Sequence, residues 1–238
     1  MMIYLAANAY PEIQFAVHQC ARFTHCPRHT HAQAIKRVCR YLKHVLDEEA
    51  GLTLKKEKGY QLDCYVDADF AGLWKQEDDQ NPVCVRSRTG YVFTLANCPV
   101  LWKSSLQTEI ALSTLESEYI ALSTAMRELI PARRLLEEII RHIDPEAIKE
   151  VPKIRSVIWE DNNGCISTVK APKLTPRTKH IAVKYHFSRS HLQDSDDKNS
   201  KSRFMIRKVD SAVQLADIFT KGLSEETFVR LRKLLCKW

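Results

Sequence analysis

YQLDCYVD, residues Tyr60–Asp67, decides the fold. Its apolar and polar side chains alternate one by one, which is the period of a β-strand with one buried face. The stretch ends on Asp67, so this carboxylate is expected at the end of the strand. Strand ends in open α/β sheets are where sites tend to form. Asp67 is therefore the first candidate site residue.

Two further strands are predicted directly downstream, at Gly90–Leu95 and Val100–Trp102. Residues Ala96–Pro99 contain Asn and Pro and are expected to form the turn between them. The segment Leu73–Arg88, rich in Asp, Gln and Asn, is expected to be an exposed loop. Together with the first strand, these segments predict a three-stranded meander.

A long helix is predicted after the meander. Ser113 and Glu116 have the spacing of a capping box, with Ser113 as N-cap and Glu116 as the third helical residue. The helix is expected to run toward His142 and to kink near Pro131. Glu118 then falls in its second turn, which makes it a second candidate site residue.

The C-terminal half continues the alternation of strands and helices. Ile154–Trp159 predicts a fourth strand, followed by a turn at Glu160–Gly164 into a short helix. A fifth strand is expected around Phe204 and Ile206, and Ser224 is expected to start a final helix. The order β-β-β-α-β-α-β-α predicts an α/β fold with a mixed five-stranded sheet flanked by helices.

Residues 1–57 are predicted to be helical. Apolar side chains recur at helical spacing over Ile13–Phe23 and again over Ala32–Val45, where a basic face accompanies them. Such a face suits contact with a nucleic-acid backbone, and an ordinary solvated face explains it equally well. The polar stretch Gln193–Ser202 is the plausible linker in the chain.

The composition and charge favour a soluble intracellular protein, cytoplasmic or nuclear, that binds a polyanion such as nucleic acid. Of 238 residues, 36 are Lys or Arg and 29 are Asp or Glu, a modest basic excess. No apolar run approaches the roughly 18 residues of a membrane span. The eight cysteines lack a C-x-x-C pair, and the His and Cys residues between His18 and His31 lack the paired spacing typical of zinc sites.

Four acids are candidates for a shared metal site: Asp67, Glu118, Asp161 and Asp217. Each is expected near a strand end or a helix start, and hard divalent cations prefer carboxylate oxygens. Each acid also has an ordinary explanation, as a turn former or as a first-turn acid that favours the helix dipole.

Several longer motifs occur together and in a fixed order. They are Tyr65–Gly72, Ser87–Tyr91, Leu112–Leu122, Glu160–Asn162, Thr178–Ile181 with Tyr185–Phe187, and Gln214–Lys221. In this order they resemble the ribonuclease H domain of copia-type retrotransposon Pol polyproteins, over residues 60–235. The resemblance implies a ribonuclease H-like fold and carries the family's metal-binding acids onto the four candidates.

The N-terminal part resembles the end of the same family's reverse transcriptase, through Tyr4–Ala6, Pro11–Ile13 and Arg40–Lys43. We therefore expect a reverse-transcriptase thumb or connection remnant over residues 1–57 and a ribonuclease H-like domain over residues 58–238. The Tyr-x-Asp-Asp motif of a polymerase does not occur, so no DNA synthesis is expected of this chain alone.

The resemblance implies hydrolysis of the RNA strand of RNA/DNA hybrids during reverse transcription, with two Mg²⁺ ions, or Mn²⁺, held by the four acids. The expected partners are the hybrid and the rest of the reverse transcriptase. Arg86, Arg88 and Lys103 are the residues we expect to grip phosphates.

Three other interpretations remain open. The chain could be a catalytically decayed remnant that at most binds nucleic acid. It could be an integrase or transposase, although those enzymes end their acid series in an Asp-to-Glu pair rather than in Asp217. It could also be a host protein that has adopted the domain.

Overall fold

The computed structural model describes residues 1–54, 60–74, 82–145, 156–173, 178, 180–192 and 204–238. Its centre is a five-stranded mixed sheet in the order β3-β2-β1-β4-β5. The strands are β1 Leu62–Asp69, β2 Arg88–Leu95, β3 Cys98–Leu106, β4 Ser156–Glu160 and β5 Phe204–Lys208. β1, β2 and β3 pair antiparallel, whereas β1, β4 and β5 pair parallel. This confirms the predicted α/β, ribonuclease H-like sheet.

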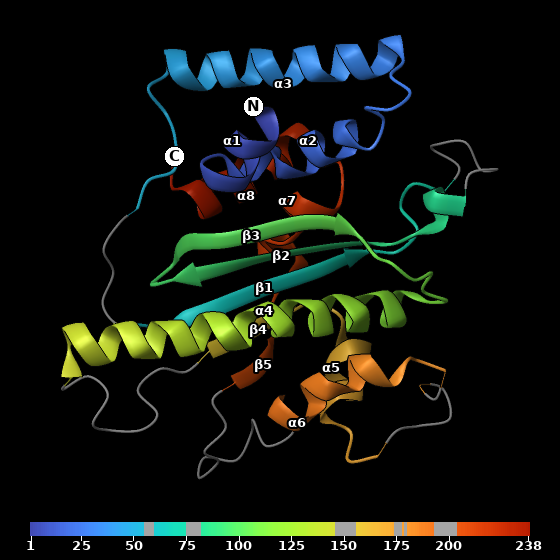
Figure 1. Ribbon diagram of the computed structural model, residues 1–238, viewed down its shortest axis with the longest axis vertical. Coiled ribbons are helices and arrows are strands. Elements are labelled where there is room, and N and C mark those ends of the chain that lie inside the picture. The colour runs from blue at the N-terminus through green and yellow to red at the C-terminus, as the bar shows by residue number, and fades with distance from the viewer. Residues whose placement is uncertain (55–59, 75–81, 146–155, 174–177, 179, 193–203) are drawn as a thin grey trace.

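Helices cover both faces of the sheet (Figure 1). They are α1 Met2–Asn8, α2 Gln14–Ala21, α3 His29–Asp47, α4 Thr114–Ile143, α5 Asn163–Lys170, α6 Arg189–Leu192, α7 Asp217–Thr220 and α8 Glu225–Cys236. In Figure 1, α4, α5 and α6 lie on one side of the sheet, and α7, α8 and the N-terminal helices lie on the other. None of the described helices is long and apolar enough to cross a membrane.

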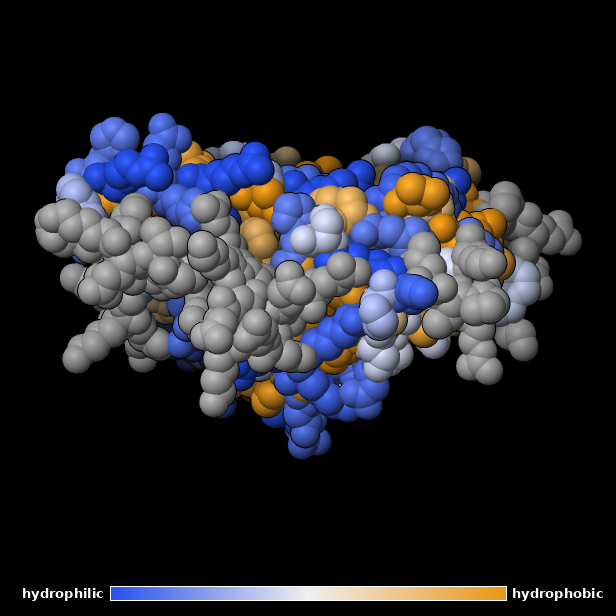
Figure 2. Space-filling model, turned by 90° about the horizontal axis from the view of Figure 1, so that it is seen from below, coloured by the Kyte–Doolittle hydropathy of each residue, from blue (hydrophilic) through white to orange (hydrophobic). Residues whose placement is uncertain are grey.

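The alternation in β1 distributes its side chains between these two layers. Cys64 and Val66 belong to the larger core beneath α4, and Tyr65 packs against the core formed with α7 and α8. Asp67 lies two residues after Tyr65 and is therefore on the same face of the sheet. Figure 2 shows the molecule from the side of α4, with hydrophilic and hydrophobic side chains interspersed over the described surface.

The hairpin between β2 and β3 is tighter than predicted. Ala96 and Asn97 alone form the turn, with φ values of 48° and 62°. Two-residue hairpins with positive φ at both positions match the right-handed twist of the strands they connect. Cys98 and Pro99 therefore belong to β3, which corrects the turn predicted over Ala96–Pro99. Pro99 is tolerated there because β3 is an edge strand.

The loop predicted over Leu73–Arg88 is only partly correct. Residues 75–81 lie outside the described residues. Cys84 and Ser87 are fully buried, and Arg88 opens β2 rather than ending a loop. The C-terminal part of this segment is thus anchored in the interior.

Helix α4 begins at the predicted N-cap. The Glu116 backbone N–H donates to Ser113 Oγ over 3.1 Å. The Glu116 carboxylate accepts the N–H of Leu112 over 2.7 Å, one residue before the partner that a capping box uses. The helix continues for 30 residues through Pro131 without interruption. Its first turns lie against the end of β1, which determines the position of Glu118.

The N-terminal helices confirm the predicted helical character of this part, and they pack on the sheet and on α8. Trp102 Nε1 of β3 donates to Ala6 O of α1 over 2.7 Å, and the Tyr41 ring of α3 lies edge to face on the Phe228 ring of α8, with centroids 5.8 Å apart. The predicted linker Gln193–Ser202 lies outside the described residues, as do Ile154 and Arg155 of the predicted fourth strand.

Candidate metal centre

Three of the four predicted acids meet at one end of the sheet. Asp67 comes from β1, Glu118 from α4, and Asp161 directly follows β4. Each offers one carboxylate oxygen, and these oxygens all lie within 4.8 Å of one another. The parallel pairing of β1 with β4 brings the carboxyl ends of both strands to the same edge. The structure thus assembles a carboxylate cluster from residues up to 94 positions apart in the sequence.

The chemistry of this cluster fits a divalent cation. Asp67 and Glu118 are 3% and 7% exposed, so their charges are poorly solvated. The Ala68 backbone N–H donates to the Glu118 carboxylate, and Glu118 Oε2 has no hydrogen-bond partner among the described residues. A cation with oxygen preference would satisfy that buried oxygen and neutralise the neighbouring charges.

Burial and repulsion from neighbouring carboxylates raise the pKa of two acids in the cluster, Glu118 and Asp67. Burial is the main cause for Glu118, and together with Glu160, Asp67 and Asp161 it raises the Glu118 pKa to about 11. The pKa of Asp67 is also raised by burial, although Lys221 and Thr220 oppose the shift. Without a further counter-charge, burial therefore favours the protonated forms of Glu118 and Asp67.

Asp161 is the most accessible of the three acids. It is only partly buried, and its Oδ2 accepts a hydrogen bond from Ser211 Oγ over 2.6 Å. The following residue, Asn162, caps α5 by accepting the Cys165 N–H over 3.0 Å. This cap fixes the turn in which Asp161 lies.

Asp217 lies beside the cluster of three. It opens the short helix α7, and its Oδ1 is 2.9 Å from Lys221 Nζ. The same ammonium group is 3.8 Å from Asp67 Oδ2. Burial, followed by the charge of Asp67, raises the Asp217 pKa to about 7, although Lys221 opposes that shift. Lys221 thus neutralises part of the charge at this edge.

Gln214 holds the strand ends together, a role that the sequence did not reveal. Its side chain is fully buried, and Nε2 donates to Val66 O over 2.9 Å and to Trp159 O over 3.4 Å. These carbonyls belong to β1 and β4, next to Asp67 and near Asp161. Gln214 therefore fixes the spacing of the two strands that carry the cluster.

Glu160 is a further acid that the sequence analysis did not assign. It is fully buried, its Oε1 accepts the Asn162 N–H over 3.0 Å, and Cys165 also hydrogen-bonds to it. Burial, with Asp67 and Asp161 nearby, raises its pKa well above the usual value for Glu. Its position at the end of the alternating fourth strand was the available signal.

The three predicted phosphate-gripping residues have different environments. Lys103 is exposed on the edge strand β3, and Arg86 is partly exposed. Arg88 is 2% exposed; its guanidinium donates to Ser104 Oγ over 3.1 Å and also contacts His18 and Gln19 of α2. Arg88 is therefore engaged inside the protein, because β2 directs it toward α2 rather than toward solvent.

The two histidines of the motifs contact α4. His180 Nε2 lies 3.3 Å from Glu116 Oε2, at the start of the helix. His186 Nδ1 lies 2.9 Å from the hydroxyl of the buried Tyr119. These contacts brace the helix that carries Glu118.

Known proteins with similar sequences include transposon polyproteins. The chain is 34% identical over 226 residues to the retrovirus-related Pol polyprotein from transposon RE1 of Arabidopsis thaliana, which covers 94% of this chain and 14% of that protein. It is 30% identical over 236 residues to the corresponding protein from transposon TNT 1-94 of Nicotiana tabacum, covering 98% and 16%. By sequence it is a relative of retrotransposon Pol polyproteins. No protein-family model matches the chain.

The chain spans about one seventh of the length of those two polyproteins. A shorter similar protein is the secreted RxLR effector protein 161 of Plasmopara viticola. It is 36% identical over 129 residues, which cover 54% of this chain and 84% of the effector.

Proposed function

We propose that this chain is a copia-type ribonuclease H that hydrolyses the RNA strand of RNA/DNA hybrids. The observation that carries the proposal is the convergence of Asp67, Glu118 and Asp161 within 4.8 Å at the ends of β1 and β4. Metal-dependent phosphodiester hydrolysis needs such a group of oxygen ligands. On this proposal, residues 1–57 are the reverse-transcriptase remnant and residues 58–238 form the nuclease domain.

The cluster acids would hold two Mg²⁺ or Mn²⁺ ions, with Asp217 contributing from α7. Bound divalent cations supply Lewis acidity and lower the pKa of a water molecule. The chain's own residues position these ligands: Gln214 fixes the strand spacing, and Ala68 holds the Glu118 carboxylate. Asp161, the most accessible acid of the three, faces the approach of the substrate.

Substrate binding would use the basic side chains that remain accessible. Lys103 on β3 is exposed and suits a phosphate contact. Selectivity for a hybrid would come from its shape and from the 2′-hydroxyl groups of the RNA strand. Arg88, which is buried against α2, is left out of this interface.

The experiment is cleavage of an end-labelled RNA/DNA hybrid by the purified chain with Mg²⁺ or Mn²⁺. The variant Asp161→Asn removes one ligand charge without changing shape, and we expect it to lose at least about 100-fold in rate. Asp47→Asn, an exposed acid on α3, is the matched control and should cleave like the wild type. Equal cleavage by the wild type and Asp161→Asn would reject the assignment.

A second candidate function is hybrid binding without cleavage. It is favoured by the position of the Lys221 ammonium group, which lies between Asp217 and Asp67 and already neutralises part of the acidic edge. A gel-shift titration in the same metal buffers separates the two candidates. Stoichiometric binding of intact hybrid without product would support the second.

A further inference from the structure

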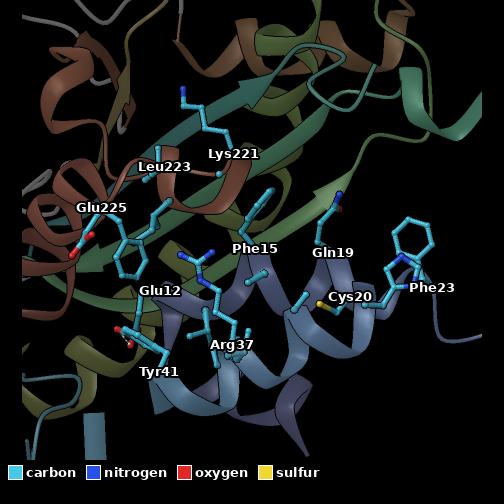
Figure 3. A pocket seen from close by; sticks show the side chains of 18 residues that line it. Glu12, Phe15, Gln19, Cys20, Phe23, Arg37, Tyr41, Lys221, Leu223 and Glu225 are labelled. Carbon is cyan, nitrogen blue, oxygen red and sulfur yellow. Dashed lines mark hydrogen bonds between the residues drawn. The ribbon is translucent and has the colours of Figure 1, made fainter. Parts of the chain in front are cut away.

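Lys221, which contacts Asp67 and Asp217, also lines a cavity of about 800 Å³. Helices α2 and α3 form one wall, and the segment from Ile218 to Phe228 forms the other (Figure 3). Its volume lies within the roughly 300–1,000 Å³ that is typical of small-ligand pockets. None of the residues that line it belongs to the carboxylate cluster.

The cavity wall is mainly apolar and unusually rich in aromatic rings. Phe15, Phe23, Tyr41 and Phe228 all line it, and each is only half-buried. The Tyr41 and Phe228 rings pack edge to face, with centroids 5.8 Å apart. In Figure 3, Phe15 extends from α2 into the space between the two walls. Phe23 is already stacked on His31, with ring centroids 4.2 Å apart, and the Arg88 guanidinium lies 5.1 Å from the Phe15 ring centroid. The Tyr41 and Phe228 rings therefore provide the stacking surface for a flat heterocycle.

Arg37 supplies a positive charge at this aromatic wall. Its side chain is exposed, extends from α3 toward the opposite wall, and makes no hydrogen bond or ion pair within the part of the chain that the structure describes. A guanidinium group in this position can donate two parallel hydrogen bonds to a phosphate.

The acidic side chains that line the cavity repel a bound anion only weakly. Glu12 is 4% exposed and accepts hydrogen bonds from the Tyr41 hydroxyl over 3.2 Å and from Cys236 Sγ over 3.5 Å. Burial raises its pKa, which favours the uncharged form. Glu225 is exposed to solvent in the first turn of α8, where water screens its charge.

We infer that this cavity binds a nucleotide, with the base stacked on the aromatic wall and the phosphate held by Arg37. The Tyr41 and Phe228 rings and the Arg37 guanidinium, which come from the facing helices α3 and α8, match the flat base and the charged phosphate of this ligand class. The nucleotide comes either from a free mononucleotide or from a single-stranded segment, since both present the same chemistry. The inference stands apart from hydrolysis, because it uses none of the cluster acids.

The test is binding without metal, in the presence of a chelator. Uridine 5′-monophosphate and a fluorescent oligouridine are titrated separately into the full chain. Arg37→Gln should weaken binding about tenfold, equivalent to about 1.4 kcal/mol. Arg40→Gln, which removes an exposed arginine of the same helix that does not line the cavity, should change it by less than about twofold.

Two additional measurements complete the test. Phe228→Leu keeps an apolar wall but removes one ring, and it should weaken binding while thermal melting confirms the fold. Asp161→Asn should bind like the wild type, so loss of cleavage and loss of this site are distinguishable. Binding of both ligands identifies a mononucleotide site, and binding of the oligonucleotide alone identifies a strand site. No binding by folded protein, or equal losses for Arg37→Gln and Arg40→Gln, would overturn the inference.

Discussion

Thr220 donates a hydrogen bond from Oγ1 to Asp67 Oδ2 across 153 positions of sequence. Both residues are buried, and the bond ties α7 to the end of β1. A carboxylate in the interior loses considerable free energy if a donor is removed, because water cannot replace it there. This bond therefore holds the first acid of the cluster in place.

Replacement of Thr220 by Val should reduce the free energy of unfolding by about 1–3 kcal/mol, since the shape is kept but the donor to Asp67 is lost. Urea denaturation measures this change. Thr227→Val removes a hydroxyl that bonds the exposed Ser224 and should change stability by less than about 0.5 kcal/mol. Equal losses in the free energy of unfolding of the two variants would show that the buried hydrogen bond from Thr220 to Asp67 stabilises the fold no more than the exposed one does.

Gly90→Ala should destabilise the fold by about 1–3 kcal/mol. Gly90 lies opposite Asp67 in the sheet, and a Cβ there would come within 2.6 Å of Thr220 Cγ2 and 2.8 Å of Phe219 Cβ. The added methyl group would push α7 away from β2. Gly51→Ala is the control, because nothing lies within 4 Å of that position. Thermal melting of both variants checks the prediction, and an unchanged melting temperature for Gly90→Ala would contradict it.

Divalent cations should stabilise the folded chain. A cation at the cluster neutralises Asp67, Glu118 and Asp161 in the folded state only. At one hundred times its dissociation constant, such a ligand contributes about 2.7 kcal/mol. We expect the melting temperature to rise with Mg²⁺ or Mn²⁺ and to fall back with a chelator, and Asp161→Asn should lose most of the rise. An equal rise in that variant would indicate that the cations bind elsewhere.

Acid should destabilise the chain through His18. Burial, and then the neighbouring Arg88 and Arg22, lowers the pKa of His18 to about 4 from 6.5. The unfolded chain therefore binds the proton more readily than the folded chain between these values. The contribution of His18 is fully present above the unfolded pKa of 6.5 and is lost as the pH falls toward about 4.

His18→Gln keeps a polar neighbour for Arg88 but removes the titration. Because His18 is only half-buried, solvent reduces the effect, and we expect the wild type to lose about 1 kcal/mol more than the variant between about pH 7 and pH 4.5. Chemical denaturation at both pH values measures the difference. Parallel losses in the two proteins would rule out His18 as the cause.

Local sequence patterns predicted most of the fold. The alternation in Tyr60–Asp67 located β1, because the side-chain period of a strand is visible without any distant contact. The N-cap of α4 at Ser113 was predictable for the same reason, since its partner Glu116 is only three residues away. Because the acids were expected near strand ends and helix starts, the sequence also identified the three acids that the structure brings together.

The contacts that support the cluster were not predictable in this way. Gln214 reaches the carbonyl of Val66 across 148 positions, and no local pattern specifies such a pair. Arg88 was expected to face a phosphate, but the register of β2 directs it to His18, 70 positions earlier. Glu160 was hidden because an acid beside Asp161 resembles an ordinary turn residue.

The docking of the N-terminal helices on α8 has a consequence for biosynthesis. Tyr41 packs against Phe228, and Glu12 accepts a hydrogen bond from Cys236, which lies 224 positions later. A ribosome releases α2 and α3 well before α8, which follows every other described element. The apolar side of α2 and α3 therefore stays exposed to solvent until α8 has been synthesised. Binding of chaperones to the nascent chain should be greatest during that interval.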